Sequence, residues 1–342
     1  MKRMRVFMVI VGLCLITGFA MAGPGAERRT DGSRRKDRYV VGFSQIGSES
    51  EWRIALSKEM QAAYEAHPRF TLLFSDAQQR QENQIAAIRN FIQQKVDAIV
   101  FVAIVANGWD AVLTEAREAG IPVLMINRGA TMVAGDIKDY TVCLVGPDNV
   151  YAGEVLARTF ADLVLASFGN EAGPINVVEL TGTVGASAAV DRGTGIHRVL
   201  DGHNRIVIKY SQTGDFTRST AKQVMESIIK TAQTEGVRLR GLIAHNDDMA
   251  IGASQAIAEA GLRPGVDIKI VGCDGVRGAF EAMVAGRYSA TVENPLGYGD
   301  KTIEILLDLL DNGRPPSDWW VVLKNAVFTE KEAAAALPNR QY

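Results

Sequence analysis

The sequence predicts an α/β protein made of two lobes, each built around a parallel, doubly wound β-sheet. Short apolar runs of strand length alternate with amphipathic helical segments along most of the chain, an order typical of a parallel sheet covered by helices. The alternation forms two successive series. A length of 342 residues exceeds what one compact domain usually holds, so we assign one series to each lobe.

The first series begins with an apolar, β-branched strand, which a loop rich in glycine and serine separates from an amphipathic helix. The third strand is almost continuously apolar, as expected of a parallel strand covered on both faces. Gly120 ends the last helix in the manner of a C-cap. The expected strands are 39–43, 70–74, 96–102, 121–126 and 140–145, and the expected helices are 50–67, 84–94 and 109–119.

The second series repeats the pattern without any visible repeat of individual residues. Its expected strands are 176–180, 205–210, 241–244, 268–271 and 289–292. Its expected helices are 150–168, 218–231, 249–260, 279–285 and one that holds Asp191 and Arg192, with Arg192 at its start. The two halves therefore look like one architecture used twice.

The N-terminus has the order of a secretory signal peptide. Residues 1–5 are basic, residues 6–20 are uncharged and apolar, and Ala20 and Ala22 are the small residues that a signal peptidase reads. An uncleaved membrane anchor is the alternative, but a span needs ~20 apolar residues. We predict a signal peptide over 1–22, a flexible leader over 23–38, and export to the periplasm.

Composition and motifs argue against several classes of function. A formal net charge of −2 gives no reason to expect nucleic acid or an anionic membrane as a partner. The sequence has no P-loop, GxSxG or HExxH motif, and its four histidines lack metal-ligand spacing. We therefore predict a protein that is not an enzyme and has no catalytic residues, metal or cofactor. Cys143 and Cys273 lie in apolar strands and are expected to be buried free thiols. A disulfide between them is the alternative, because export to an oxidising compartment would permit one.

Polar side chains follow many of the predicted strands, and in open α/β sheets ligands bind at the carboxyl ends of the strands. Carboxylates, amides and guanidinium groups together donate to and accept from hydroxyls, as a neutral polyhydroxylated ligand requires. Aromatic rings can cover the C–H face of a sugar. The candidates from this pattern are Gln45, Ser50, Trp52, Asn127, Arg128, Arg192, Phe216, Asn246, Asp274 and Glu293.

Four of these candidates also have a purely structural interpretation. Asn246 and Asp274 could cap helices or form Asx turns. Arg192 could be a surface ion-pair partner, which contributes little to stability. Trp52 could belong to the core, and the remaining tryptophans, Trp109, Trp319 and Trp320, are expected to be packing residues.

Longer motifs resemble the type I periplasmic sugar-binding proteins of ABC transporters, the ribose- and galactose-binding family, and within it the galactofuranose-binding branch. The resemblance covers nearly the whole chain after the signal peptide. It is carried by Gly42-Phe-Ser-Gln-Ile-Gly-Ser-Glu-Ser-Glu-Trp-Arg53, Gln81-Glu-Asn-Gln-Ile85, Val178-Glu-Leu-Thr-Gly-Thr-Val-Gly-Ala-Ser187, Ser211-Gln-Thr-Gly-Asp-Phe-Thr-Arg-Ser219 and Ala244-His-Asn-Asp-Asp-Met249.

The resemblance implies two Rossmann-like lobes joined by a three-segment hinge, near 146–149, 293–295 and 322–325. The first lobe would be 39–146 plus 295–323, and the second 147–294 plus 324–342. Family members usually have Asp-Arg where this chain has Asn127-Arg128. The implied ligand contacts are Ser50, Trp52, Arg53, Arg128, Arg192, Phe216, Asn246, Asp274 and Glu293. We expect the carboxylates of Asp274 and Glu293 to accept most of the hydrogen bonds that the sugar hydroxyls donate.

The resemblance further implies a monomeric receptor whose lobes close on a monosaccharide, and a galactofuranose-like sugar is the ligand we expect. The receptor would deliver this sugar to an ABC permease in the inner membrane. Alternatives are a receptor for another pentose or hexose, or an exported sensor that feeds a membrane chemoreceptor or kinase. A transcriptional repressor would need an N-terminal helix-turn-helix in place of the signal peptide. A hydrolase or dehydrogenase would need a nucleophile and base that the motifs do not supply.

Overall fold

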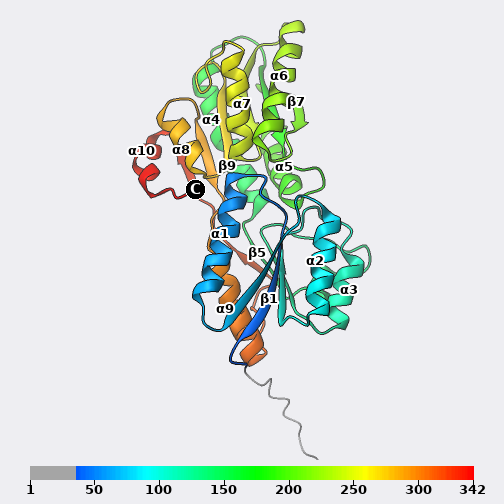
Figure 1. The fold of residues 1–342 in the computed structure, drawn as a ribbon. Helices are drawn as coiled ribbons and strands as arrows, with labels where there is room; N and C mark the ends of the chain where they lie inside the picture. Colours follow the sequence, from blue (N-terminus) through cyan, green and yellow to red (C-terminus); the bar gives the residue numbers. More distant parts are fainter. Residues whose placement is uncertain (1–35) are drawn as a thin grey trace, which may run out of the picture. The chain divides into compact units, whose positions relative to one another are not determined.

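The computed structural model describes residues 36–342 and confirms the predicted α/β fold. The described chain has two six-stranded sheets, in the orders β11-β5-β4-β3-β1-β2 and β12-β10-β9-β8-β6-β7 (Figure 1). The predicted signal peptide and nearly all of the predicted leader lie outside the described residues. Within 36–342, no helix has the length and apolarity needed to cross a membrane.

The first sheet has five parallel strands in the first part of the chain: β1 (Tyr39–Gln45), β2 (Phe70–Asp76), β3 (Ala98–Phe101), β4 (Val123–Ile126) and β5 (Cys143–Gly146). Its helices are α1 (Glu51–Ala66), α2 (Gln81–Gln93), α3 (Asp110–Glu118) and, from late in the chain, α9 (Tyr298–Asn312). Figure 1 shows α1 and α9 together on one side of β1, and α2 and α3 on the other.

The second sheet has five parallel strands: β6 (Ile175–Thr181), β7 (Ile206–Thr213), β8 (Leu239–Ala244), β9 (Lys269–Asp274) and β10 (Ala290–Glu293). Its helices are α4 (Asn149–Phe168), α5 (Ser187–Leu200), α6 (Arg218–Thr234), α7 (Asp247–Glu259) and α8 (Arg277–Val284). We use "first lobe" and "second lobe" for the two sheets with the helices that cover them.

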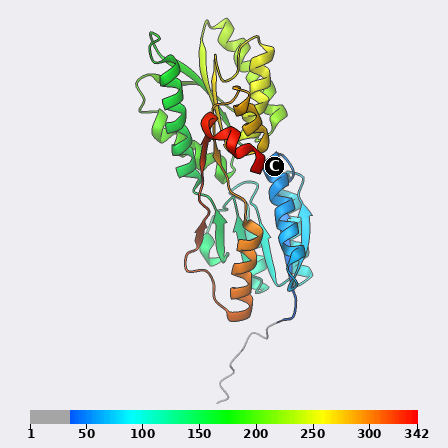
Figure 2. The ribbon, with the colours of Figure 1, turned by 90° about the vertical axis from the view of Figure 1, so that its left-hand side faces the viewer.

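The last part of the chain adds one short strand to each sheet. β11 (Trp320–Val322) pairs parallel with β5, and β12 (Val327–Thr329) pairs antiparallel with β10. Helix α10 (Glu330–Ala336), red in Figures 1 and 2, then packs against α8. The sequence pattern did not reveal these elements, because strands of three half-exposed residues leave no clear alternation of apolar and polar positions.

Two predicted positions need correction. Helix α2 begins at Gln81 and not at residue 84. The sequence does not indicate this start, because the N-cap residue Arg80 is not a typical capping residue and makes no side-chain capping bond. Arg192 is the sixth residue of α5 rather than its first, since the helix already begins at Ser187. Cys143 and Cys273 are both buried and free, as expected.

Glu59 on α1 lies where this helix meets α9, which Figure 2 shows beside it. Its Oε1 accepts a hydrogen bond from the Gly299 N–H at 2.8 Å. Its Oε2 is buried and has no partner in the described part of the chain. Burial, only partly offset by that hydrogen bond, raises the pKa of Glu59 to about 7.

We expect Glu59→Gln to raise the free energy of unfolding by about 1–2 kcal/mol at pH 8, after allowance for solvent screening, and to change it little near pH 4.5. The folded state binds the Glu59 proton more tightly than the unfolded state. Stability from this group is therefore complete below the ordinary pKa and is lost as the pH rises through about 7. Urea unfolding at both pH values measures the effect. Glu65→Gln, on an exposed position of the same helix, is the control, and an equal effect of both variants would contradict the assignment.

Candidate ligand-binding site between the two lobes

Nine of the eleven candidate residues line one cavity between the lobes. The exceptions are Glu293 and Gln45, whose buried side chain donates to Ser57 Oγ at 3.0 Å. The nine lining residues come from the loops that follow β1, β4, β7 and β8, from the last residue of β9, and from helices α1 and α5. Ala188 and Asn294 complete the wall. The lining residues are Ser50, Trp52, Arg53, Asn127, Arg128, Ala188, Arg192, Phe216, Asn246, Asp274 and Asn294.

The start of α1 contributes three residues of the first-lobe wall. The Ser50 side chain caps the helix by accepting a hydrogen bond from the Arg53 N–H at 3.2 Å. The Trp52 indole N–H donates to the Asn294 carbonyl at 2.7 Å, so the ring is fixed at the edge of the cavity. The Arg53 guanidinium lies 5.0 Å from the centroid of that ring. One helix turn therefore places both an aromatic face and a cation in the wall.

Asn127 and Arg128 follow β4 directly. Asn127 has a φ of +63°, a left-handed conformation that asparagine tolerates better than most residues. Its amide oxygen accepts from the Arg53 Nη2 at 3.1 Å, and its amide nitrogen lies 3.5 Å from the Tyr298 hydroxyl. Arg128 extends across to the second lobe, where its guanidinium carbon is 4.7 Å from the Phe216 ring centroid.

Arg192 is the main cation of the second-lobe wall and is 3% exposed. Its Nη1 donates to the His245 carbonyl at 2.6 Å, its Nε donates to Asn149 Oδ1 at 3.2 Å, and its Nη2 lies 3.6 Å from Asp274 Oδ1. The interpretation of Arg192 as a surface ion-pair partner is therefore wrong. Asp274 itself has a φ of +123°, which is strained backbone of a kind found at functional sites.

The Phe216 ring packs directly against Gly182, in the loop after β6. A Cβ at Gly182 would lie 2.0 Å from the Phe216 ring, so only glycine leaves room for it. Asn246 supports the same segment, because its amide nitrogen donates to the Phe216 carbonyl at 3.1 Å while its Oδ1 caps α7. Asn246 is thus both a helix cap and a lining residue.

Glu293 does not line the cavity, contrary to expectation. Its carboxylate forms an ion pair with Arg340 from the C-terminal segment. Successive side chains of a strand point to opposite faces, and the next residue, Asn294, is the one that reaches the cavity. The structure therefore places Asn294, and not Glu293, in the cavity wall at the end of this strand.

Glu49 is a buried residue of the site that sequence reasoning missed. Its Oε1 is 3.1 Å from Arg53 Nε and 3.7 Å from Arg128 Nη2. Burial alone would raise its pKa, but the two guanidinium groups outweigh burial and hold the pKa of Glu49 below its usual range. Its place in the motif Ser48-Glu49-Ser50 between polar neighbours gave no sign of burial.

Burial also shifts the pKa of one lining residue in each wall, Arg128 in the first lobe and Asp274 in the second. The pKa of Arg128 falls to about 9 because of burial and the nearby positive charge of Arg53. The pKa of Asp274 rises to about 7 because of burial, which Arg192 offsets only in part. Both shifts follow from the burial of these side chains away from water.

Three lining side chains have buried polar atoms with no hydrogen-bond partner in residues 36–342: Arg53 Nη1, Arg128 Nε and Asn294 Oδ1. Buried polar groups in folded proteins are nearly always paired, with protein, water or a ligand. Two donors and one acceptor are therefore available to a molecule in this cavity.

Direct contacts hold the two lobes together around the cavity. The Glu51 backbone N–H on α1 donates to Asp248 Oδ2 at 2.8 Å, and the Glu51 carboxylate accepts from Arg218 Nη2 at 2.7 Å. The Gly129 N–H donates to Ser187 Oγ at 3.0 Å. The lobes are therefore in a closed arrangement, with polar contacts that lie outside the cavity wall.

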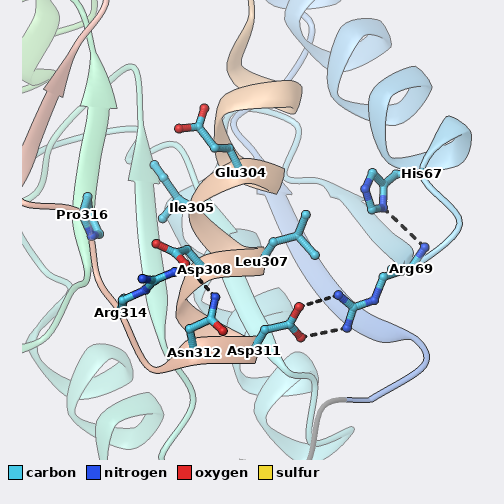
Figure 3. A pocket seen from close by; sticks show the side chains of 10 residues that line it. All are labelled: His67, Arg69, Glu304, Ile305, Leu307, Asp308, Asp311, Asn312, Arg314 and Pro316. Carbon is cyan, nitrogen blue, oxygen red and sulfur yellow. Dashed lines mark hydrogen bonds and ion pairs between the residues drawn. The ribbon is translucent and has the colours of Figure 1, made fainter.

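The cavity is tight. About 260 Å³ lie between its protein atoms. The groove in Figure 3 is larger, at about 1030 Å³, but it is an open surface along α9. It holds two ion pairs, Arg69 with Asp311 and Arg314 with Asp308, and its Glu304 pairs with Lys301. The larger volume therefore does not identify the ligand-binding site. The buried polar atoms without a partner identify the smaller cavity between the lobes as the candidate.

Comparisons with known proteins agree with this architecture. Residues 41–315 match the family described as "Periplasmic binding protein domain". The chain belongs to this family of periplasmic binding proteins. A crystal structure of a galactofuranose binding protein superposes with a TM-score of 0.82 at 40% identity, covering 89% of this chain and 98% of the other. Membership in a family of binding proteins agrees with the prediction that the chain is not an enzyme.

Two further relatives of this periplasmic binding protein are informative. The galactofuranose-binding protein YtfQ of Escherichia coli K12 is 46% identical over 257 residues, 74% of this chain and 76% of YtfQ. The binding component of the arabinose ABC transporter of Shewanella sp. ANA-3, solved with α- and β-L-arabinofuranose, has a TM-score of 0.81 at 39% identity, over 88% of this chain and 95% of that one.

Proposed function

We propose that this protein is the exported receptor of an ABC sugar importer and binds one monosaccharide, in the furanose form, between its lobes. The observation that carries the proposal is the convergence of nine predicted polar and aromatic side chains on one buried cavity between the lobes. Relatives whose names specify galactofuranose or arabinofuranose binding support the ring form.

In this proposal each wall has its own role. Arg53, Arg128 and Arg192 donate to ring and hydroxyl oxygens, and Asp274 and Asn294 accept from hydroxyls. Trp52 and Phe216 cover the C–H faces of the sugar. The side chains of Ser50, Asn127 and Asn246 hold these groups in place and complete the polar lining.

The sugar enters while the lobes are apart, because in the closed arrangement residues of both lobes surround the cavity and contact one another beside it. The hinge consists of the three chain crossings at 147–148, 294–297 and 323–326, between elements of different sheets. The ligand favours closure by contacting both walls at once. We further propose that residues 1–22 direct export, and that the closed monomer docks on an inner-membrane permease.

A thermal-shift screen followed by calorimetry tests the ligand. The panel contains pentoses, hexoses and polyols, with galactofuranose and arabinofuranose among them. The proposal requires micromolar or tighter binding of at least one monosaccharide at one site per chain. Failure of every sugar in the panel to bind would contradict it.

Closure has a separate expected result. A saturating sugar should decrease the radius of gyration measured by solution X-ray scattering, because the sugar stabilises the closed arrangement. Arg218→Ala removes a donor that bridges Glu51 and Asp248 outside the cavity. We expect this variant to retain the sugar site but to close less completely. A radius of gyration that does not change on sugar binding would contradict the hinge.

A further inference from the structure

The first-lobe wall of the cavity carries more positive than negative charge. Arg53 and Arg128 are each 3% exposed, and both pair with the same carboxylate, Glu49. No other carboxylate in residues 36–342 forms an ion pair with either guanidinium. Asn127, which accepts from Arg53, is neutral. Two buried cations therefore share one anion on this wall.

The second-lobe wall is balanced. Arg192 lies 3.6 Å from the Asp274 carboxylate. Behind them, the buried Asp247 accepts from the Tyr288 and Thr291 hydroxyls and from two backbone N–H groups, and it does not line the cavity. The unmatched charge is therefore located on the first-lobe side, beside Asn127.

The unmatched cations also present the unpaired donors. Arg53 Nη1 and Arg128 Nε are both buried without a partner in the described residues. A buried cation is costly unless it is paired, and a guanidinium group binds a carboxylate more strongly than a neutral acceptor. Both the charge and the open donors on this wall thus suit a carboxylate.

We propose that the preferred ligand is a monosaccharide carrying one carboxylate, a sugar of the uronate type, whose carboxylate lies against Arg53 and Arg128. This inference rests on the proposed function and specifies its substrate class. A carboxylate at residue 127 would neutralise the wall and favour neutral sugars. Asn127 is therefore the residue that determines the preference for charge.

Calorimetry at pH 7 with matched sugar pairs tests the proposal. D-galacturonate is compared with D-galactose, and D-glucuronate with D-glucose, because the members of each pair differ only at C6. We expect at least one uronate to bind roughly tenfold or more tightly than its neutral partner. Asn127→Asp should lower this ratio by about tenfold, since it places a negative charge beside Arg53. Asn90→Asp, exposed on α2, adds the same charge far from the cavity and should leave the ratio unchanged.

The outcomes separate the two levels of the proposal. Neutral sugars that bind as tightly as the uronates would overturn the substrate class and leave the sugar receptor intact. A ratio that Asn127→Asp leaves unchanged, in a variant that still unfolds cooperatively, would overturn the role of Asn127. If that variant fails to fold, the ratio of uronate to neutral-sugar affinity in the wild-type protein decides whether the substrate class is correct. Failure of all four sugars to bind would overturn the substrate class, whereas the proposed function is decided by the wider panel that includes the furanoses.

Discussion

Arg192→Ala is expected to weaken monosaccharide binding at least about a hundredfold, because it removes a buried donor and leaves Asp274 without its cation. Truncating one partner of a buried charge pair at an interface typically costs about 2–5 kcal/mol. Arg192 also bonds the His245 carbonyl and Asn149, so its loss releases the segment that precedes Asn246. Calorimetry on the folded variant measures the change.

The matched control for Arg192 is Arg198→Ala on the same helix. Arg198 is exposed and pairs with Glu154 at 3.3 Å on the surface of the second lobe. An exposed pair of this kind contributes about 0–1 kcal/mol to stability and should not affect the sugar. Binding that survives Arg192→Ala at wild-type affinity, or that Arg198→Ala weakens equally, would show that Arg192 does not contact the ligand.

The fold could be predicted because its signals are local and repeated. Strand-length apolar runs ending in polar residues, such as Ile126 followed by Asn127 and Arg128, identify both the strand and the edge at which ligands bind. Parallel strands bring their carboxyl ends to one edge of a sheet. Residues distant in sequence, such as Ser50 and Asn127, could therefore be assigned to one site from the amino-acid sequence alone.

The errors in the site come from properties that a one-dimensional pattern does not contain. Glu293 and Asn294 are adjacent polar residues at a strand end, and only the direction of each side chain separates the one that pairs with Arg340 from the one that faces the cavity. Glu49 lies in a polar loop that would suit the surface. Its burial depends on two arginines that the fold brings to it from different segments.

Helices α4 and α5 approach each other at two glycines, and this contact positions Arg192. A Cβ at Gly153 on α4 would lie 2.2 Å from the Arg192 carbonyl oxygen, and a Cβ at Gly195 on α5 would lie 2.1 Å from the Val150 carbonyl oxygen. In both cases the obstacle is backbone, which cannot rotate away as a side chain can. The two helices must therefore separate if either glycine gains a side chain.

We expect Gly153→Ala to lower the free energy of unfolding by about 2–3 kcal/mol, although alanine favours a helix over glycine by about 1 kcal/mol. The same shift should move Arg192 relative to Asp274 and weaken sugar binding. Gly193→Ala on α5 is the control, because its Cβ would meet only His245 at 3.5 Å, an ordinary contact. Urea unfolding compares the two variants. Equal stability of Gly153→Ala and Gly193→Ala would show that the two helices can separate without cost, and that close packing of α4 on α5 does not hold Arg192 in the wall.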